Sequence, residues 1–239
     1  KGRVDLEYIA ELAKTSFHEA EQELNGSLIF FDPDLQQWEP RWSYLSGNVV
    51  DKLEKVSQLA QISPEFEVNV TALEAVQPEK IPFSGITINL GATWIPENYV
   101  REFVEHIFDD KLSEYDFKLR YSSLLAEWSV EVSNRFKTGN GATRQAQWGT
   151  PDAPFETLLE MQLNSKRPKH YVEVDGKRVL NAEATNASQE KQNAIQEAFT
   201  SWLAADPDRA EKIAEIYNRT CNVMVLPEVS GEWLSFPGL

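Results

Sequence analysis

The sequence contains one cysteine, Cys221, and no long hydrophobic run. A single cysteine excludes an internal disulfide, and chains without disulfides are typical of reducing compartments. The longest apolar stretches, residues 86–90 and 221–226, fall far short of the roughly 20 apolar residues that a membrane-spanning helix needs. Residues 1–5 lack the features of a signal peptide. We therefore expect a cytoplasmic protein without membrane contact.

The sequence also lacks a general surplus of positive charge. Its net charge is −15, which taken whole argues against a nucleic-acid binder, because phosphate contact requires clustered lysine and arginine. The charge is unevenly spread: residues 118–180 carry 10 basic and 7 acidic side chains, whereas the stretches on either side are strongly acidic. Any basic face is therefore expected within residues 118–180.

The motifs of catalysis are missing as well. The sequence contains no phosphate-binding glycine loop, no G-x-S-x-G nucleophile turn and no cysteine pair for zinc. Its three histidines, His18, His106 and His170, lie in different segments without ligand spacing. We predict no catalytic residue, no metal ligand and no cofactor within this chain. A metal-dependent hydrolase built from aspartate and glutamate is the less favoured alternative.

The first 45 residues have the element order of a winged-helix unit. Asp5 is a plausible N-cap for a helix over residues 5–13, and Ser16 with Glu19 forms a capping box for a helix over residues 17–24. Two short strands, residues 27–31 and 37–40, then follow as a hairpin. DNA docking by the second helix is one interpretation, but its glutamates would be repelled by phosphate. A small structural or protein-contacting module is therefore favoured.

The remaining residues, 46–239, are predicted to form a mixed domain of helices and antiparallel hairpins, so that the fold class is α+β. Alternation predicts a strand at 86–90, and paired strands are predicted at 117–121 and 127–132. The polar, glycine-containing stretch 136–149 is predicted to be a mobile loop. Asp175-Gly176 indicates a hairpin turn. Helices are predicted at 49–61, 65–76, 97–107, 154–163, 188–203 and 208–218.

The middle of the chain interleaves basic and aromatic residues, as nucleic-acid surfaces do. The aromatic members are Tyr121, Trp128, Phe136, Trp148 and Tyr171, and His170 lies among the cations. Aromatic rings at strand spacing also commonly face a core, so both interpretations stay open. The candidate DNA-binding residues are Lys118, Arg120, Arg135, Lys137, Arg144, Lys166, Arg167, Lys169, Lys177 and Arg178.

Seven phrases, in this order, resemble one family over nearly the whole chain. They are YLSGNVVDKL (44–53), LGATWIP (90–96), QWGT (147–150), TNASQEK (185–191), FTSW (199–202), YNRTCN (217–222) and LSFPGL (234–239). They resemble the segment just upstream of the helicase core in large bacterial helicase–methyltransferase proteins of plasmids, phages and integrative elements. Those proteins join a Swi/Snf-type superfamily-two helicase to an adenine-specific DNA methyltransferase. Lys14 departs from the glycine common at the turn between the first two helices.

The resemblance implies an accessory fragment whose catalytic parts lie elsewhere in a larger protein. ATP, Mg and S-adenosylmethionine are expected only for that parent protein, and the adjacent helicase and methyltransferase domains are the expected partners. The predicted role is to guide DNA or to couple the methyltransferase to the motor. A protein–protein spacer without DNA contact is the alternative, anchored by Trp233, Leu234 and Phe236, since aromatic side chains such as those of Trp233 and Phe236 are typical interface anchors.

Overall fold

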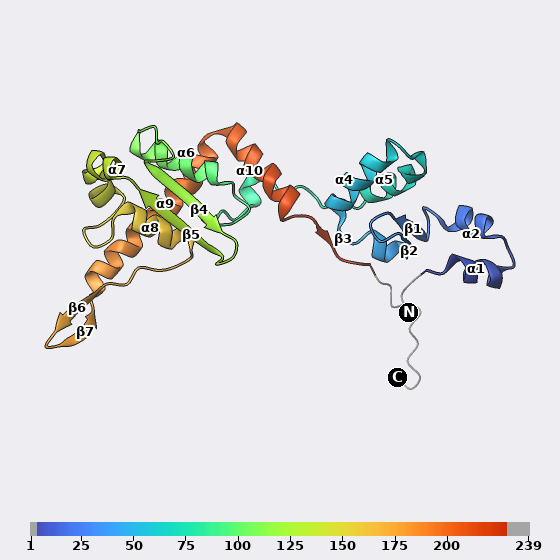
Figure 1. The fold of residues 1–239 in the computed structure, drawn as a ribbon, viewed down its shortest axis with the longest axis horizontal. Helices are drawn as coiled ribbons and strands as arrows, with labels where there is room; N and C mark the ends of the chain where they lie inside the picture. Colours follow the sequence, from blue (N-terminus) through green and yellow to red (C-terminus); the bar gives the residue numbers. More distant parts are fainter. Residues whose placement is uncertain (1–3, 229–239) are drawn as a thin grey trace. The chain divides into compact units, whose positions relative to one another are not determined.

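The computed structural model describes residues 4–228 and divides the chain into two compact units. The first unit consists of Lys1–Ile81 and Tyr217–Leu239, and the second of Pro82–Ile216 (Figure 1). The boundary predicted between residues 45 and 46 lies inside the first unit, because Tyr44 and Leu45 pack in one core with residues that follow them. The chain thus leaves the first unit once and later returns to it.

The winged-helix portion follows from local capping chemistry. Asp5 accepts a hydrogen bond from the Tyr8 amide, and Ser16 and Glu19 form the expected reciprocal capping box. A small core holds the helices against the hairpin, and Leu6, Ala20 and Ile29 are buried in it. The elements are α1 (Leu6–Ala13), α2 (Phe17–Leu24), β1 (Ile29–Asp32) and β2 (Gln37–Pro40). This portion agrees with its prediction.

The rest of the first unit surrounds a second core. Phe30 and Tyr44 stack there with ring centroids 5.1 Å apart, over Val49, Val56 and Leu73. The elements are α3 (Arg41–Tyr44), β3 (Gly47–Asn48), α4 (Val49–Ala60), η1 (Pro64–Phe66), α5 (Glu67–Glu74) and β8 (Met224–Val225). Strand β3 pairs antiparallel with β8, which ties the returning chain into this unit.

The second unit buries many aromatic side chains, among them Phe103, Phe117, Phe136, Phe155 and Phe199. Its elements are η2 (Phe83–Gly85), α6 (Glu97–Phe108), β4 (Phe117–Ser122), β5 (Glu127–Val132), α7 (Asn134–Gly139), η3 (Thr143–Gln147), α8 (Phe155–Leu163), β6 (Tyr171–Val174), β7 (Lys177–Leu180) and α9 (Ala182–Ala205). Helix α10 (Pro207–Thr220) runs across the boundary between the units. Within residues 4–228 every sheet is a two-stranded antiparallel ribbon, so the α+β prediction is confirmed.

Two local predictions are wrong. Residues 86–90 form no strand: Ile86, Ile88 and Leu90 are buried in alternation as expected, but no neighbouring strand pairs with them. Residues 136–149 form α7 and the π-helical turn η3 instead of a loop, because Phe136 is buried in the core. Among residues 4–228, no helix is both long enough and apolar enough to cross a membrane.

Candidate nucleic-acid interface

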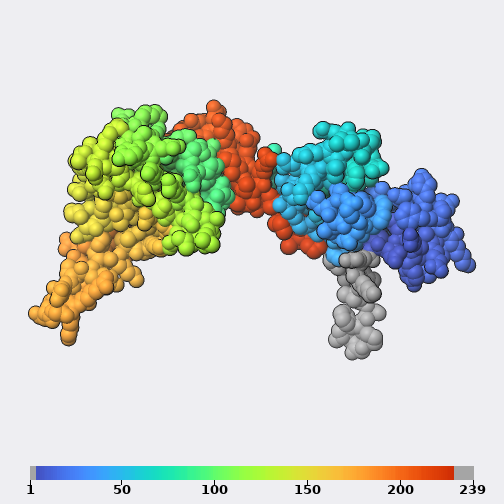
Figure 2. Space-filling view, viewed as in Figure 1, coloured from blue at the N-terminus to red at the C-terminus, as the bar shows by residue number. Residues whose placement is uncertain are grey.

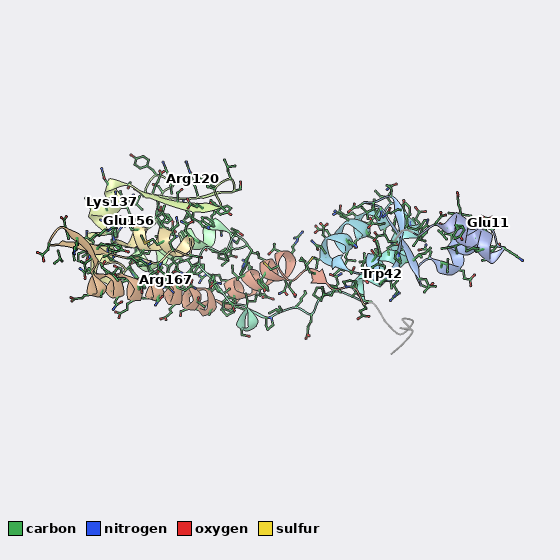
Figure 3. All side chains as sticks on the ribbon, turned by 90° about the horizontal axis from the view of Figure 1, so that it is seen from below. Glu11, Trp42, Arg120, Lys137, Glu156 and Arg167 are labelled. Atoms are coloured by element: carbon green, nitrogen blue, oxygen red, sulfur yellow. The ribbon has the colours of Figure 1, made fainter. Side chains whose placement is uncertain are left out.

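The ten basic residues predicted to contact DNA all lie in the second unit, but they do not form one continuous surface. Arg120 and Lys137 lie on one side of this unit, and Arg167 lies on the opposite side, along α9 (Figure 3). The residues are better divided by what their charged groups already contact. A cation that is neutralised by a carboxylate is less available to a phosphate, whereas an unpaired one is free to bind.

Three of these cations hold carboxylates at short distances. Arg135 Nη1 lies 2.6 Å from Asp116, Arg144 Nη1 lies 2.7 Å from Glu156, and Lys166 Nζ lies 2.9 Å from Glu127. A fourth, Lys118, lies 3.9 Å from Glu131 across the ribbon, a pair of small energetic value on an exposed surface. These partners come from distant segments and have no signal in the sequence.

Asp116 and the pair Arg144–Glu156 show that these cations stabilise the fold by neutralising largely buried carboxylates. The hydroxyl groups of Ser113 and Ser133, together with Arg135, hold the pKa of buried Asp116 below its usual range. Arg144 is only 8% exposed. Breaking a buried pair by removing one partner leaves an uncompensated charge, which is strongly destabilising.

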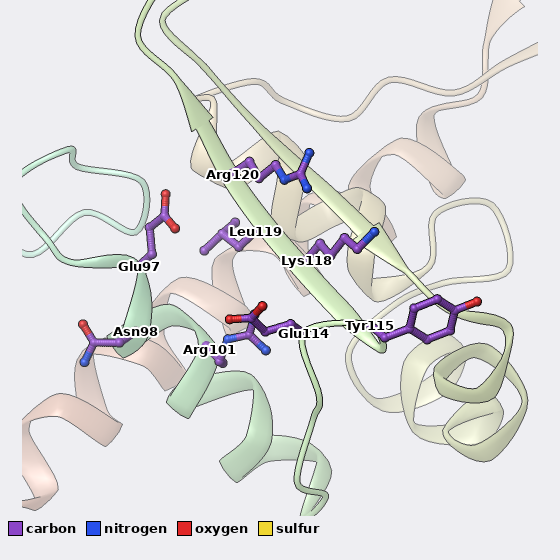
Figure 4. Close-up of a pocket in the computed structure, with 8 residues that line it drawn as sticks. All are labelled: Glu97, Asn98, Arg101, Glu114, Tyr115, Lys118, Leu119 and Arg120. Atoms are coloured by element: carbon purple, nitrogen blue, oxygen red, sulfur yellow. The ribbon is translucent and has the colours of Figure 1, made fainter.

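A groove beside β4 carries a mixed set of charges (Figure 4). Lys118 and Arg120 reach it from the outer face of β4, but Glu97 and Glu114 also line it. Its third cation, Arg101, donates to the backbone carbonyl of Phe117 at 2.9 Å and is therefore committed to the fold. The groove offers a phosphate little net attraction.

The ribbon of β6 and β7 is different in kind. It stands out from the rest of the second unit (Figure 2), and all eight of its strand residues are exposed. Within the described part of the chain, Lys169, Lys177 and Arg178 have no carboxylate partner. Residues 166–180 carry five basic and two acidic side chains, a net charge of +3 in a chain of −15. The unpaired positive charge of the predicted set is therefore densest here.

The turn and the base of this ribbon are well defined. Asp175 and Gly176 both have positive φ angles of 50° and 70°, as the predicted two-residue hairpin turn requires. At the base, the His170 amide donates to Thr185 Oγ1 at 3.0 Å, and its ring Nε2 lies 2.8 Å from Ser188 Oγ. These contacts fix the ribbon to α9.

The aromatic residues of the predicted surface also differ, since some are buried in the fold whereas Tyr171 is exposed. Trp128 on β5 is buried, which supports the interpretation that rings at strand spacing face the core, and Phe136 is buried on helix α7. Tyr171, at the start of β6, is 43% exposed and lies under the Arg178 guanidinium, 4.1 Å from its ring centroid. Tyr171 and Arg178 were both predicted from the sequence, but only the strand register shows that they share a face of the ribbon.

No group of three or more histidine, cysteine, aspartate or glutamate side chains suited to a metal ion occurs among residues 4–228. His106 does lie near Glu102, Glu105 and Asp109 on one open surface. Glu105 forms an ion pair with Lys111, whose Nζ lies 2.9 Å away, and this contact lowers the pKa of Glu105.

Two regions of the chain match known protein families. Residues 1–39 match the family described as "Probable helicase, winged helix domain", which confirms the winged-helix prediction and shows that this part of the chain is similar to a helicase-associated domain. Residues 89–223 match the family described as "Domain of unknown function (DUF8437)". Because that match covers more than half of the chain, the protein belongs to the DUF8437 family. No curated protein and no solved structure matches the chain.

Proposed function

We propose that this chain is a non-catalytic accessory region of a DNA helicase, and that it guides DNA by means of the β6–β7 ribbon. The helicase-type winged helix supports the association with a motor. The finer picture follows the sequence resemblance: a bacterial mobile-element protein that also carries a methyltransferase, works in the cytoplasm, and uses ATP, Mg and S-adenosylmethionine outside this chain. Adjacent domains of the same polypeptide are its proposed partners.

The observation that carries the DNA contact is the unpaired charge of the projecting ribbon. Lys177 and Arg178 lie on a ribbon that is exposed on both faces, Lys169 lies just before it, and a two-stranded ribbon fits the major groove of a duplex. Three phosphate contacts would give a salt dependence with a slope of about −3 in log affinity against log salt. The proposed contact is therefore weak alone and serves a protein held on DNA by its motor.

The test is fluorescence anisotropy of the full chain with a labelled oligonucleotide at increasing salt. The double variant Lys169→Glu/Lys177→Glu is expected to weaken binding at least tenfold. The matched control, Lys80→Glu/Lys212→Glu, changes the net charge equally at exposed positions that are not part of the ribbon and is expected to have little effect. Arg135, Arg144 and Lys166 are unsuitable for this test because each holds a carboxylate.

Failure to bind DNA at low salt, or equal weakening by both double variants, would refute the proposal. The second candidate function, a protein-contacting spacer, would then be preferred. An apolar groove in the first unit favours it, since Leu28, Trp42 and Leu226 are exposed along its walls. The predicted anchors Trp233, Leu234 and Phe236 lie outside the described residues.

A further inference from the structure

The β6–β7 ribbon carries a shallow pocket of about 520 Å³ along β6, next to its free edge. Lys169, Tyr171, Glu173 and Arg178 line it, with Gly176 at the turn. The pocket is open to solvent, and its lining combines an aromatic ring, a guanidinium and an ammonium group. This is the combination with which proteins hold single nucleotide units.

The strand register places the flat groups on one face. Tyr171 pairs with Leu180 and Glu173 pairs with Arg178, so the side chains of these four residues share one side of the ribbon. The opposite side carries Val172, Val174, Lys177 and Val179, and therefore no ring and no guanidinium. Arg178 covers one part of the Tyr171 ring, while 43% of Tyr171 remains exposed. The ring and the outer plane of the guanidinium are both flat surfaces on which a base can stack.

The charged residues along the pocket favour one orientation of a bound nucleotide. Lys169 precedes β6 at the base of the ribbon, whereas Glu173 and Asp175 lie toward the tip. Lys169 attracts a phosphate on one side of Tyr171 and Glu173 repels it on the other, so a nucleotide in the pocket would place its phosphate near Lys169 and its nucleobase over Tyr171 and Arg178. Since Arg178 already lies over the ring, the stacking surface is ordered before a ligand arrives.

We infer that this pocket binds an unstacked base of single-stranded nucleic acid, so that the ribbon prefers single strands to duplex. The inference rests on the proposed DNA contact and adds the form of the ligand to it. In a duplex the faces of the bases are stacked on one another, and only their edges reach the grooves. A single strand exposes base faces, and stacking on an aromatic ring tolerates every base because each has such a face.

The experiment compares the full chain on a labelled 12-nucleotide oligo(dT) and on a 12-base-pair duplex at the same salt concentration. The wild-type chain is expected to bind oligo(dT) more tightly. Tyr171→Ala is expected to weaken oligo(dT) binding by roughly 5- to 150-fold, the range typical of one lost base–aromatic stack, and to change duplex binding less than twofold. Tyr171→Phe is expected to retain the preference. Val179→Ala, on the opposite face of the ribbon and outside the lining of the pocket, is the matched control.

A second measurement guards against a misfolded ribbon. Photocrosslinking of the wild-type chain to an oligonucleotide that contains 5-iodouracil is expected to label residues 169–178, with Tyr171 as the main site. Equal affinity for the two probes, or crosslinks confined to other segments, would overturn the inference and leave the proposed function standing. Binding to neither probe would instead refute the proposed function itself.

Discussion

Tyr44 is the most enclosed polar side chain of the first unit, at 1% exposure. Its hydroxyl oxygen accepts a hydrogen bond from Asn69 Nδ2 at 2.9 Å, and the same amide donates to the carbonyl of Phe31 at 3.0 Å. Burial raises the pKa of the Tyr44 hydroxyl to about 12. The folded chain therefore keeps its proton over a pH range in which an unfolded chain, with the ordinary value of 10.0, releases it.

This difference predicts a specific alkaline sensitivity. Because the pKa of Tyr44 is raised in the folded state, its contribution to folding stability is fully present below pH 10 and is lost as the pH rises toward 12. Tyr44→Phe is expected to cost about 1 kcal/mol of folding free energy at neutral pH, because Asn69 loses one of its two acceptors. It should also show a smaller loss of stability between pH 9 and pH 11.5 than the wild-type chain.

Urea unfolding at both pH values measures this effect. Because the comparison is a difference between two proteins, the contributions of all other tyrosines cancel. An equal loss of stability in the two proteins would show that Tyr44 ionises normally in the folded chain.

At the scale of elements, residues 86–90 show how a side chain replaces a strand. The amide of Leu90 donates to Gln196 Oε1 at 2.8 Å, and Gln196 Nε2 donates to the carbonyl of Ile88 at 2.9 Å. One glutamine on α9 therefore supplies the donor and the acceptor that a neighbouring strand would otherwise supply. The alternating burial of this segment is real, but its backbone is satisfied from a helix about a hundred residues later.

Gln196→Leu is expected to destabilise the second unit by about 2 kcal/mol, because two backbone groups then lose their partner in a partly buried position. Glu197→Ala, at an exposed neighbouring position of the same helix, should change stability little. Thermal unfolding measures both variants. Similar melting temperatures for Gln196→Leu and the wild-type chain would mean that water satisfies both backbone groups.

The same contrast explains what the sequence can and cannot predict. Helices α1 and α2 and the ribbon β6–β7 depend on nearby residues such as Ser16, Glu19 and Gly176, so local patterns predict them well. The helical form of residues 136–149 depends on the buried Phe136 and on Arg144, whose partner Glu156 lies on α8. Likewise, the ten basic residues were identifiable, but the carboxylates that neutralise several of them come from other elements.

At the scale of the whole chain, each unit has its own core, and this predicts that each responds to its own core substitutions. Gly91 lies in the second unit with φ of +104°, and a Cβ atom there would collide with the backbone of Leu163. Gly91→Ala is therefore expected to cost at least about 2 kcal/mol. Gly139→Ala is the control, since Gly139 has open space around it and no positive φ.

Amide hydrogen exchange followed by mass spectrometry measures the outcome for each unit separately. Gly91→Ala should accelerate exchange in residues 82–216 and leave α4 and α5 of the first unit protected. Tyr44→Phe should do the reverse. Uniform loss of protection across both units in either variant would show that the chain unfolds as one cooperative block.

The pairing of β3 with β8 constrains the order in which the parts of the chain can fold during synthesis on the ribosome. Residues 47–48 find their partner only when residues 224–225 have been synthesised, and by then every residue of the second unit has been made. Domains usually fold in the order of synthesis, from the N-terminus onward. Here the N-terminal unit is expected to gain its last strand pairing only after the unit that interrupts it has been translated, so β3 would stay without its partner during that time although the buried residues of its two cores, all within residues 6–73, are already present.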